Sequence, residues 1–256
     1  LYRENIFPSW WRLVPTKGKQ TFVTDWPKTP LEREIAIRTY LQKNSDGFGV
    51  VTGTLSGGLI ALDIDGPDAD ARYRELAGDE YFELGKEDTM STSSGREGRR
   101  QIFYRIPHSV EPCLREVNKL VFKDNGWHST KGEDKIDQKS KQDKKYEELV
   151  LRYNRCQSVL PGSRHPVTKK LYQFINYNHG KVAYAPKWIM EVLFPLMTPS
   201  PFLSDADLRE IVDDGRGQAL PDKQIRGWFF SDKMKTLVSD NSCLLYTSPS
   251  PRDRVQ

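Results

Sequence analysis

The sequence predicts a mixed α/β (α+β) fold in which antiparallel-rich sheets are flanked by helices. Short runs of apolar and β-branched residues end at glycines or prolines, as strands joined by tight turns do. Between these runs lie segments that open with a hydroxyl residue or a proline and continue with apolar residues at helical spacing. No internal repeat is visible, so a solenoid or propeller is not expected.

The first part of the chain predicts a loop and then a helix. Residues 8–28 combine Trp, Pro and Lys and are expected to form a loop-rich segment. The signal Thr29-Pro30-Leu31-Glu32 supplies a hydroxyl N-cap, a proline in the first turn and an acid. It predicts a helix that runs to about Leu41.

Two strands are predicted next. Residues 47–53 form a short run bounded by glycines, and residues 59–65 form an apolar run that contains two acids at its end. Because only a tight turn separates them, we expect the two strands to pair as an antiparallel hairpin. The glycines at 53, 57 and 58 either serve turn geometry or let the backbone approach a phosphate closely, and both interpretations stay open.

The rest of the chain alternates between the two kinds of element. The sequence predicts a helix at 67–76, strands at 101–107, 149–153, 157–160 and 171–175, and helices that begin at Pro186 and Ser204. Residues 123–145 are rich in Lys and Asp and have few large apolar side chains. Since such a range cannot bury enough surface to offset ordering, we expect a mobile charged insertion without a site.

Charge and composition restrict the class of protein. The 256 residues include 39 Lys and Arg against 35 Asp and Glu, a formal net charge of +4. This mild basic excess suits a nucleic-acid partner without requiring one. The cysteines show no metal-ligand spacing, which is typical of a reducing cytosol, and no apolar run reaches the roughly 18–20 residues that span a bilayer. We therefore expect a cytoplasmic protein with no membrane partner.

Both ends of the sequence look cut. Residues 243–256 resemble a translated sequencing adaptor and are expected to be an artefact. Residues 201–242 are expected to begin a helical linker or a following region. The functional domain is therefore expected within residues 1–200.

An acid pair ends the apolar run 59–65. Because side chains alternate along a strand, Asp63 and Asp65 point the same way, with their Cα atoms roughly 6.6 Å apart. Two such carboxylates can hold a hard divalent cation beside a polyphosphate. Taken alone, the pattern is more often a strand that ends in a solvated acidic turn.

Two further motifs carry groups that bind phosphate. Residues 89–100 form a turn with many hydroxyls and three arginines, which can contact a triphosphate or a nucleic-acid backbone. A solvated hairpin loop is the alternative. His165 follows Ser163 and Arg164 at a strand end; such a histidine is more often a surface residue, but its ring can donate to a phosphate oxygen.

The order of these motifs resembles a known family. Gly-x-Gly-Val-Val-Thr-Gly is followed by Ser-Gly-Gly-Leu and Leu-Asp-Ile-Asp, then by Thr-Ser-Ser-Gly with Gly-Arg-Arg-Gln-x-x-Tyr-Arg-Ile-Pro, and last by Cys-Gln-Ser-Val-Leu-Pro-Gly-Ser-Arg-His-Pro. From about Trp11 to Leu193 the chain resembles the bifunctional DNA primase/polymerase N-terminal (prim-pol) domain of the archaeo-eukaryotic primase superfamily. The resemblance implies the catalytic core of that superfamily within residues 1–200, with its active site in a cleft between sheets.

The resemblance also implies an activity and its residues. It implies template-directed nucleotidyl transfer in DNA replication, for example of a plasmid, phage or mobile element, with Mg²⁺ or Mn²⁺ as cofactor. The implied partners are a single-stranded DNA template, nucleoside triphosphates and a helicase domain or protein. The implied metal ligands are Asp63 and Asp65, and these two residues and His165 are the implied catalytic residues. The implied nucleotide-binding residues are Thr92, Ser94, Arg100, Ser163, Arg164 and His165.

The sequence departs from the family pattern in one respect. The family pattern has a third catalytic carboxylate after Ser-x-His, but Glu191 is the only acid between Pro166 and Ser204, and Glu147 and Glu148 precede the motif. Two alternatives therefore stay open: a prim-pol module that binds single-stranded DNA or nucleotide without catalysis, or another metal-dependent phosphotransferase that uses Asp-x-Asp.

Overall fold

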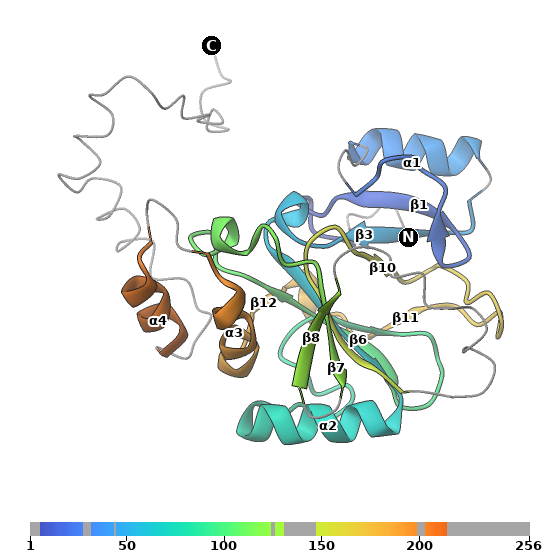
Figure 1. The fold of residues 1–256 in the computed structure, drawn as a ribbon. Helices are drawn as coiled ribbons and strands as arrows, with labels where there is room; N and C mark the ends of the chain where they lie inside the picture. Colours follow the sequence, from blue (N-terminus) through green and yellow to red (C-terminus); the bar gives the residue numbers. More distant parts are fainter. Residues whose placement is uncertain are drawn as a thin grey trace, which may run out of the picture. The chain divides into compact units, whose positions relative to one another are not determined.

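The computed structural model describes residues 6–27, 32–43, 45–123, 126–130, 147–198 and 203–213 (Figure 1). All of these belong to one compact unit, residues 1–218, and the second unit, residues 219–256, lies outside the described residues. The described chain is a mixed α/β fold with two sheets, which confirms the predicted class. No helix in the described ranges is long and apolar enough to cross a membrane.

The smaller sheet has the strand order β10-β3-β1-β2, and all of its pairs are antiparallel. Its strands are β1 (Leu13–Lys17), β2 (Gln20–Thr21), β3 (Gly47–Val51) and β10 (Gln157–Val159). Strands β1 and β2 lie in the segment predicted to be a loop, so that prediction was wrong. Helix α1 (Arg33–Gln42) packs on this sheet, and the ring of Tyr40 stacks on that of Phe48 at 4.5 Å between centroids. The predicted start of this helix, at 29–31, lies outside the described residues.

The larger sheet has the order β11-β5-β6-β4-β9-β7-β8, and β12 pairs with β6 in parallel. Its strands are β4 (Leu59–Asp65), β5 (Ser91–Ser93), β6 (Arg99–Arg105), β7 (Lys119–Lys123), β8 (Gly126–Thr130), β9 (Leu149–Arg152), β11 (Gln173–Asn176) and β12 (Ala183–Tyr184). The central strand β4 pairs along its whole length with β6 and over four residues with β9.

The remaining elements are helices and short 3₁₀ turns. The helices are α2 (Pro67–Ala77), α3 (Lys187–Leu193) and α4 (Asp205–Asp213), and the 3₁₀ turns are Thr54–Ser56, Gly78–Glu80, Glu111–Leu114, Asn178–Gly180 and Phe194–Leu196. The start of α4 confirms the predicted cap: Ser204 N–H donates to the Asp207 carboxylate at 2.8 Å, and Asp207 N–H donates back to Ser204 Oγ at 3.3 Å.

The predicted hairpin between residues 47–53 and 59–65 was wrong, because its two strands belong to different sheets. Only the isolated bridge between Gly53 and Leu59 joins them. In the turn, Gly58 has a φ of +77°, and a Cβ there would lie 2.8 Å from the carbonyl oxygen of Ile106. This glycine therefore serves a close turn that takes the chain from one sheet to the other, at the end of β4 far from Asp65.

The two faces of β4 are covered differently. Ile60, Leu62 and Ile64 belong to a core shared with α2, α3 and α4. Leu59 and Ala61 belong to the other core, shared with residues of the smaller sheet such as Phe48. Because side chains alternate along the strand, Asp63 and Asp65 lie on the same side as Leu59 and Ala61, the side that faces the smaller sheet. The expected cleft between the sheets stays a prediction.

Part of the predicted insertion is ordered. Residues 126–130 form β8, which pairs with β7, and the Trp127 ring packs edge-on against Phe122 at 5.4 Å. The prediction of a mobile segment was therefore wrong for this strand. Residues 131–145 lie outside the described residues.

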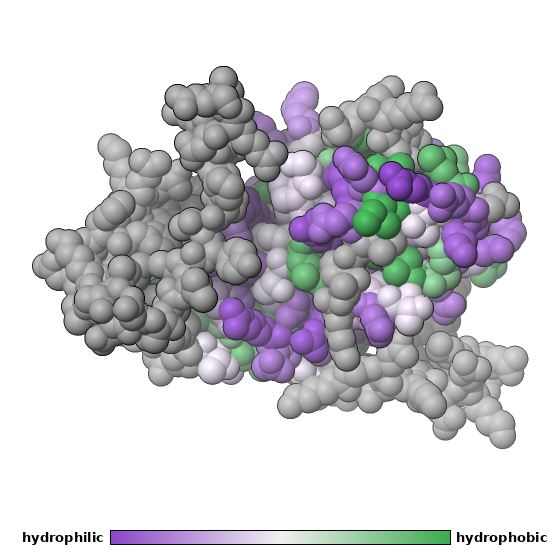
Figure 2. Space-filling view, turned by 90° about the horizontal axis from the view of Figure 1, so that it is seen from above, coloured by the Kyte–Doolittle hydropathy of each residue, from purple (hydrophilic) through white to green (hydrophobic). Residues whose placement is uncertain are grey.

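The face seen from above in Figure 1 is mixed in character. Figure 2 shows hydrophilic side chains there with hydrophobic ones scattered among them. The exposed apolar residues of α1 include Ile35 and Leu41. Single exposed apolar side chains are normal on protein surfaces, so we assign no role to this face.

A buried charge network joins α2 to the larger sheet. The Arg100 side chain is 3% exposed and lies 2.8 Å from the Asp70 carboxylate and 3.5 Å from the fully buried carboxylate of Glu87. Arg100 also donates to the carbonyl of Phe82 at 2.9 Å. Removing this guanidinium would leave Glu87 as a buried charge with no compensating cation.

We therefore expect Arg100→Ala to lower the free energy of unfolding by about 3–5 kcal/mol, measured by urea denaturation. The control Arg38→Ala removes an exposed arginine of α1 and should change stability by less than about 0.5 kcal/mol. The double variant Glu87→Gln/Arg100→Met should recover part of the loss. Equal stability of Arg100→Ala and the control would contradict the assignment.

Candidate functional site

The acid pair lies at the end of β4, between two neighbouring strands. Asp63 is opposite Gln101 of β6 and Val150 of β9, and Gln101 Nε2 donates to Asp63 Oδ1 at 3.2 Å. Asp65 is opposite Arg99 of β6. Both carboxylates are partly exposed, 19% for Asp63 and 36% for Asp65, so a ligand can reach them.

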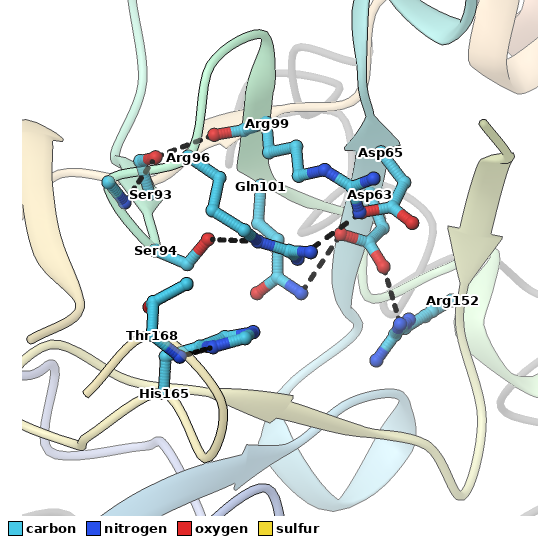
Figure 3. A network of polar contacts seen from close by, with 11 residues as sticks. Asp63, Asp65, Ser93, Ser94, Arg96, Arg99, Gln101, Arg152, His165 and Thr168 are labelled. Atoms are coloured by element: carbon cyan, nitrogen blue, oxygen red, sulfur yellow. Dashed lines mark hydrogen bonds and ion pairs between the residues drawn. The ribbon is translucent and has the colours of Figure 1, made fainter. Parts of the chain in front are cut away.

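Three arginines converge on these carboxylates (Figure 3). Arg152 of β9 forms an ion pair with Asp63, and Arg99 forms one with Asp65. Arg96, in the turn between β5 and β6, places its guanidinium 3.5 Å from the Asp65 carboxylate. Since the side chains of these arginines are 17–31% exposed, their ion pairs are partly solvated and can exchange partners.

His165 faces the acid pair from the connection between β10 and β11 (Figure 3). The Thr168 N–H donates to His165 Nδ1 at 3.1 Å, so the neutral ring carries its proton on Nε2. That Nε2 is buried and has no hydrogen-bond partner among the described residues. The imidazole therefore offers one uncommitted N–H.

The local field keeps His165 neutral. Burial first, and then the positive charges of Lys19, Arg96 and Arg99, together lower the pKa of His165 from 6.5 to about 4. At neutral pH the ring is therefore a hydrogen-bond donor without a charge of its own. Such a donor can bind an anion without the desolvation cost of a further buried cation.

Ser163 has a structural contact in place of a free hydroxyl. Its side chain is fully buried; Oγ donates to the carbonyl of Phe48 and accepts from the Phe48 N–H, both at 3.0 Å. A Cβ at Gly47 would overlap Ser163 Oγ, so the segment of Ser163 approaches β3 closely here. Ser163 therefore fixes the segment that carries His165 to β3, and its predicted contact with a nucleotide stays a prediction.

Of the predicted hydroxyls in residues 89–100, Thr92 and Ser94 lie near residues that contact the acid pair. Thr92 of β5 is opposite Gln101, and its buried hydroxyl has no hydrogen-bond partner in the described structure. Ser94 Oγ accepts a hydrogen bond from Arg96 Nε at 3.2 Å, so it orients that arginine. Arg164 is exposed and donates to the carbonyl of Lys169 at 3.2 Å.

Arg100 corrects the sequence prediction. It was expected among the nucleotide-binding residues, but its side chain joins the α2 network on the opposite face of the larger sheet. The reason is strand alternation, because Arg99 and Gln101 take the face of the acid pair and Arg100 takes the other. The arginines of this turn that reach the carboxylates are Arg96 and Arg99.

Comparison with known families decides the class. A family model described as “Bifunctional DNA primase/polymerase, N-terminal” (Prim-Pol) matches residues 6–188. The chain belongs to this family. The matched range contains every strand described above, and with it Asp63, Asp65 and His165. A comparison with curated proteins gave no match.

The donor set of this prim-pol domain fits a cation that arrives with a polyphosphate. Asp63 and Asp65 offer two carboxylates on one strand face, and Mg²⁺ in such sites takes its other oxygens from phosphates and water. Among the described residues, no group of three or more His, Cys, Asp or Glu side chains converges to hold a metal. The fit is therefore to a cation held only in part by protein.

The acids considered for a third ligand are placed as follows. Glu147 accepts the N–H of Asp68 at 2.6 Å and so caps the start of α2. Glu191 lies on α3, 3.8 Å from Lys187. The carbonyl of Glu148 accepts the N–H of Asp65 at 3.1 Å, which places Glu148 next to Asp65 in the β4–β9 ladder.

Sequence reasoning missed Lys19 and Arg152, which the structure identifies by their charge interactions with the acid pair. Arg96 and Arg99 were predicted only as members of the turn 89–100, and the structure pairs both with Asp65. Gln101 was also missed. Because side chains alternate along a strand, the sequence could have placed Arg99 and Gln101 together on one face and Arg100 on the other. The pairing of β9 with β4, which brings Arg152 to Asp63, has no local signal.

The lowered pKa of His165 makes stability depend on pH in a defined direction. Since the ordinary pKa is 6.5 and the folded value is about 4, the unfolded chain binds more protons between these values. The contribution of His165 is thus complete above pH 6.5 and is lost as the pH falls toward 4. We expect the free energy of unfolding to fall less over this range in His165→Asn than in wild type, measured by urea denaturation. Identical pH dependence in both proteins would contradict a buried neutral ring.

Proposed function

We propose that this prim-pol domain catalyses template-directed nucleotidyl transfer as a DNA primase/polymerase in replication, with Mg²⁺ or Mn²⁺ as cofactor. Its substrates would be nucleoside triphosphates and its template single-stranded DNA. The observation that carries the proposal is the acid pair of Asp63 and Asp65 set among more cations than it can neutralise. An electrostatic site of this kind favours a metal–triphosphate complex over either ion alone.

The carboxylates would hold the cation and the surrounding cations would hold the phosphates. When bound, the cation supplies Lewis-acid chemistry, activating an attacking 3′-hydroxyl and neutralising the pyrophosphate that leaves. Arg99 and Arg152 now pair with the acids, and those partly solvated pairs are weak. Their guanidinium groups can therefore turn to phosphate oxygens, which they bind in the same forked geometry.

His165 would add a directed hydrogen bond to the same phosphates. Its Nε2–H is uncommitted, and the Thr168 N–H fixes the tautomer that carries it. Because Ser163 ties this segment to β3, the ring is held in place before substrate arrives. Preorganised donors of this kind stabilise charge that develops during phosphoryl transfer without reorganisation.

One observation favours a second candidate, a prim-pol module that binds single-stranded DNA or nucleotide without catalysis. No third acid converges on the pair among the described residues, and both carboxylates are engaged by arginines. A small-molecule phosphotransferase that uses Asp-x-Asp would leave the His165 segment without a role. A helicase partner and a cytoplasmic location stay predictions from the sequence.

We expect Asp63→Ala/Asp65→Ala to reduce nucleotide incorporation on a primed single-stranded template, with Mg²⁺ or Mn²⁺, by on the order of a hundredfold or more. The matched control is Glu75→Ala/Asp79→Ala, which removes two exposed acids near α2 and should keep wild-type activity.

Equal activity of wild type and the acid-pair variant would exclude nucleotidyl transfer at this site. If the wild type binds Mg²⁺–triphosphate or DNA tightly but incorporates nothing, the binding module is the correct function. Isothermal titration of both proteins with Mg²⁺–triphosphate separates these cases, because it requires no turnover.

A further inference from the structure

The segment that carries His165 also presents an outward basic surface. We call Arg164, Lys169 and Lys170 the outer basic cluster; all three are exposed. The segment from Gly162 to Tyr172 contains no Asp or Glu, so nothing in it neutralises these charges. The site described above uses only the inner side of this segment.

This segment is a well-defined hairpin, which fixes the positions of its cations. The Tyr172 N–H donates to the carbonyl of Ser163 at 2.9 Å, and the His165 N–H donates to that of Lys170 at 2.8 Å. Lys169 has a φ of +59°, a left-handed conformation that lysine rarely adopts, and its N–H donates to the carbonyl of His165 at 2.9 Å. Backbone strain held by its surroundings is most often found at functional sites.

The outer basic cluster is continuous with the inner site. Lys170 Nζ lies 3.4 Å from the carbonyl oxygen of Gly95, in the turn that carries Arg96 and Arg99. On the other side, a Cβ at Gly18 would lie 3.6 Å from Pro166, so the turn that carries Lys19 also borders the hairpin. The positive surface therefore runs from the acid pair outward over three turns that are distant in sequence.

One triphosphate cannot account for the whole surface. The four inner cations, Lys19, Arg96, Arg99 and Arg152, already exceed the two carboxylates. The outer cluster adds three more on the far side of His165. Between them the apolar side chain of Val167 is 81% exposed at the hairpin tip. A ligand that fits this surface must extend beyond the nucleotide. It must carry negative charges at regular intervals, with apolar surface between them.

We propose that the outer basic cluster binds the phosphate backbone of a single-stranded nucleic acid, with Val167 against its sugars or bases. The choice of partner rests on the proposed function. One hairpin would then position the nucleotide with its inner side and the strand with its outer side, and so set the distance between them.

The test is direct binding of a fluorescent single-stranded oligonucleotide, by anisotropy at several salt concentrations, in EDTA and without nucleotide. We expect Lys169→Glu/Lys170→Glu to weaken binding at least tenfold at low salt. Each lost phosphate contact should reduce the slope of log K against log salt by about 0.7. The matched control, Arg115→Glu/Lys123→Glu, makes the same charge change at two other exposed positions and should keep the wild-type slope.

Further variants and ligands complete the design. Lys169→Gln/Lys170→Gln removes charge without reversing it, and a thermal melt of each variant excludes misfolding. A duplex of the same sequence distinguishes partners, because a duplex contact changes the slope by about 0.9 per phosphate. If the lysine substitutions weaken binding to the duplex more than binding to the single strand, the single-strand assignment is overturned.

Wild-type slope and affinity in both lysine variants would overturn the proposal. This outcome is distinguishable from failure of the proposed function, because the assay contains neither metal nor nucleotide. An incorporation assay over a range of template concentrations supplies the converse: the lysine variants should keep kcat and raise the KM for template, whereas the acid-pair variant should lose kcat.

Discussion

The whole site depends on the position of β4, a strand that is buried on both faces until it reaches its acids. Alternate residues of the strand pack under α2, and the residues between them pack toward the smaller sheet. The strand can therefore neither rotate nor slip by one residue without exposing one of the two cores. Asp63 and Asp65 lie on the side of the strand that faces the smaller sheet, at the end where the side chains on that side become only partly buried. The acid pair is thus held by apolar packing on both sides.

Electrostatics then decides what the held carboxylates can do. Arginines from two neighbouring strands and one turn form ion pairs with them, and the excess of positive charge extends to His165. Burial of the imidazole, together with these charges, lowers the pKa of His165 to about 4. A site with this balance of charge attracts anions. Among the described residues, no third acid converges on the pair.

The hairpin of His165 connects the two sheets to this chemistry. Ser163 bonds both polar atoms of the Phe48 backbone in the smaller sheet, and Gly47 leaves room for that approach. The strand that leaves the hairpin, β11, joins the edge of the larger sheet beside β5. The hairpin is therefore anchored to both sheets.

The sequence by itself determined what depends on a few consecutive residues. Alternation put Asp63 and Asp65 on one side, the cap at Ser204 marked the start of α4, and the order of motifs indicated the family that the comparison then showed. Tertiary structure alone decided which strands pair. It separated residues 47–53 from 59–65 into two sheets, turned Arg100 away from the acids, brought Arg152 to Asp63 and gave the Ser163 hydroxyl to β3. The physical reason is the distance along the chain. Periodicity fixes the face of one element, whereas its partners are chosen by burial among residues as far as 115 positions apart.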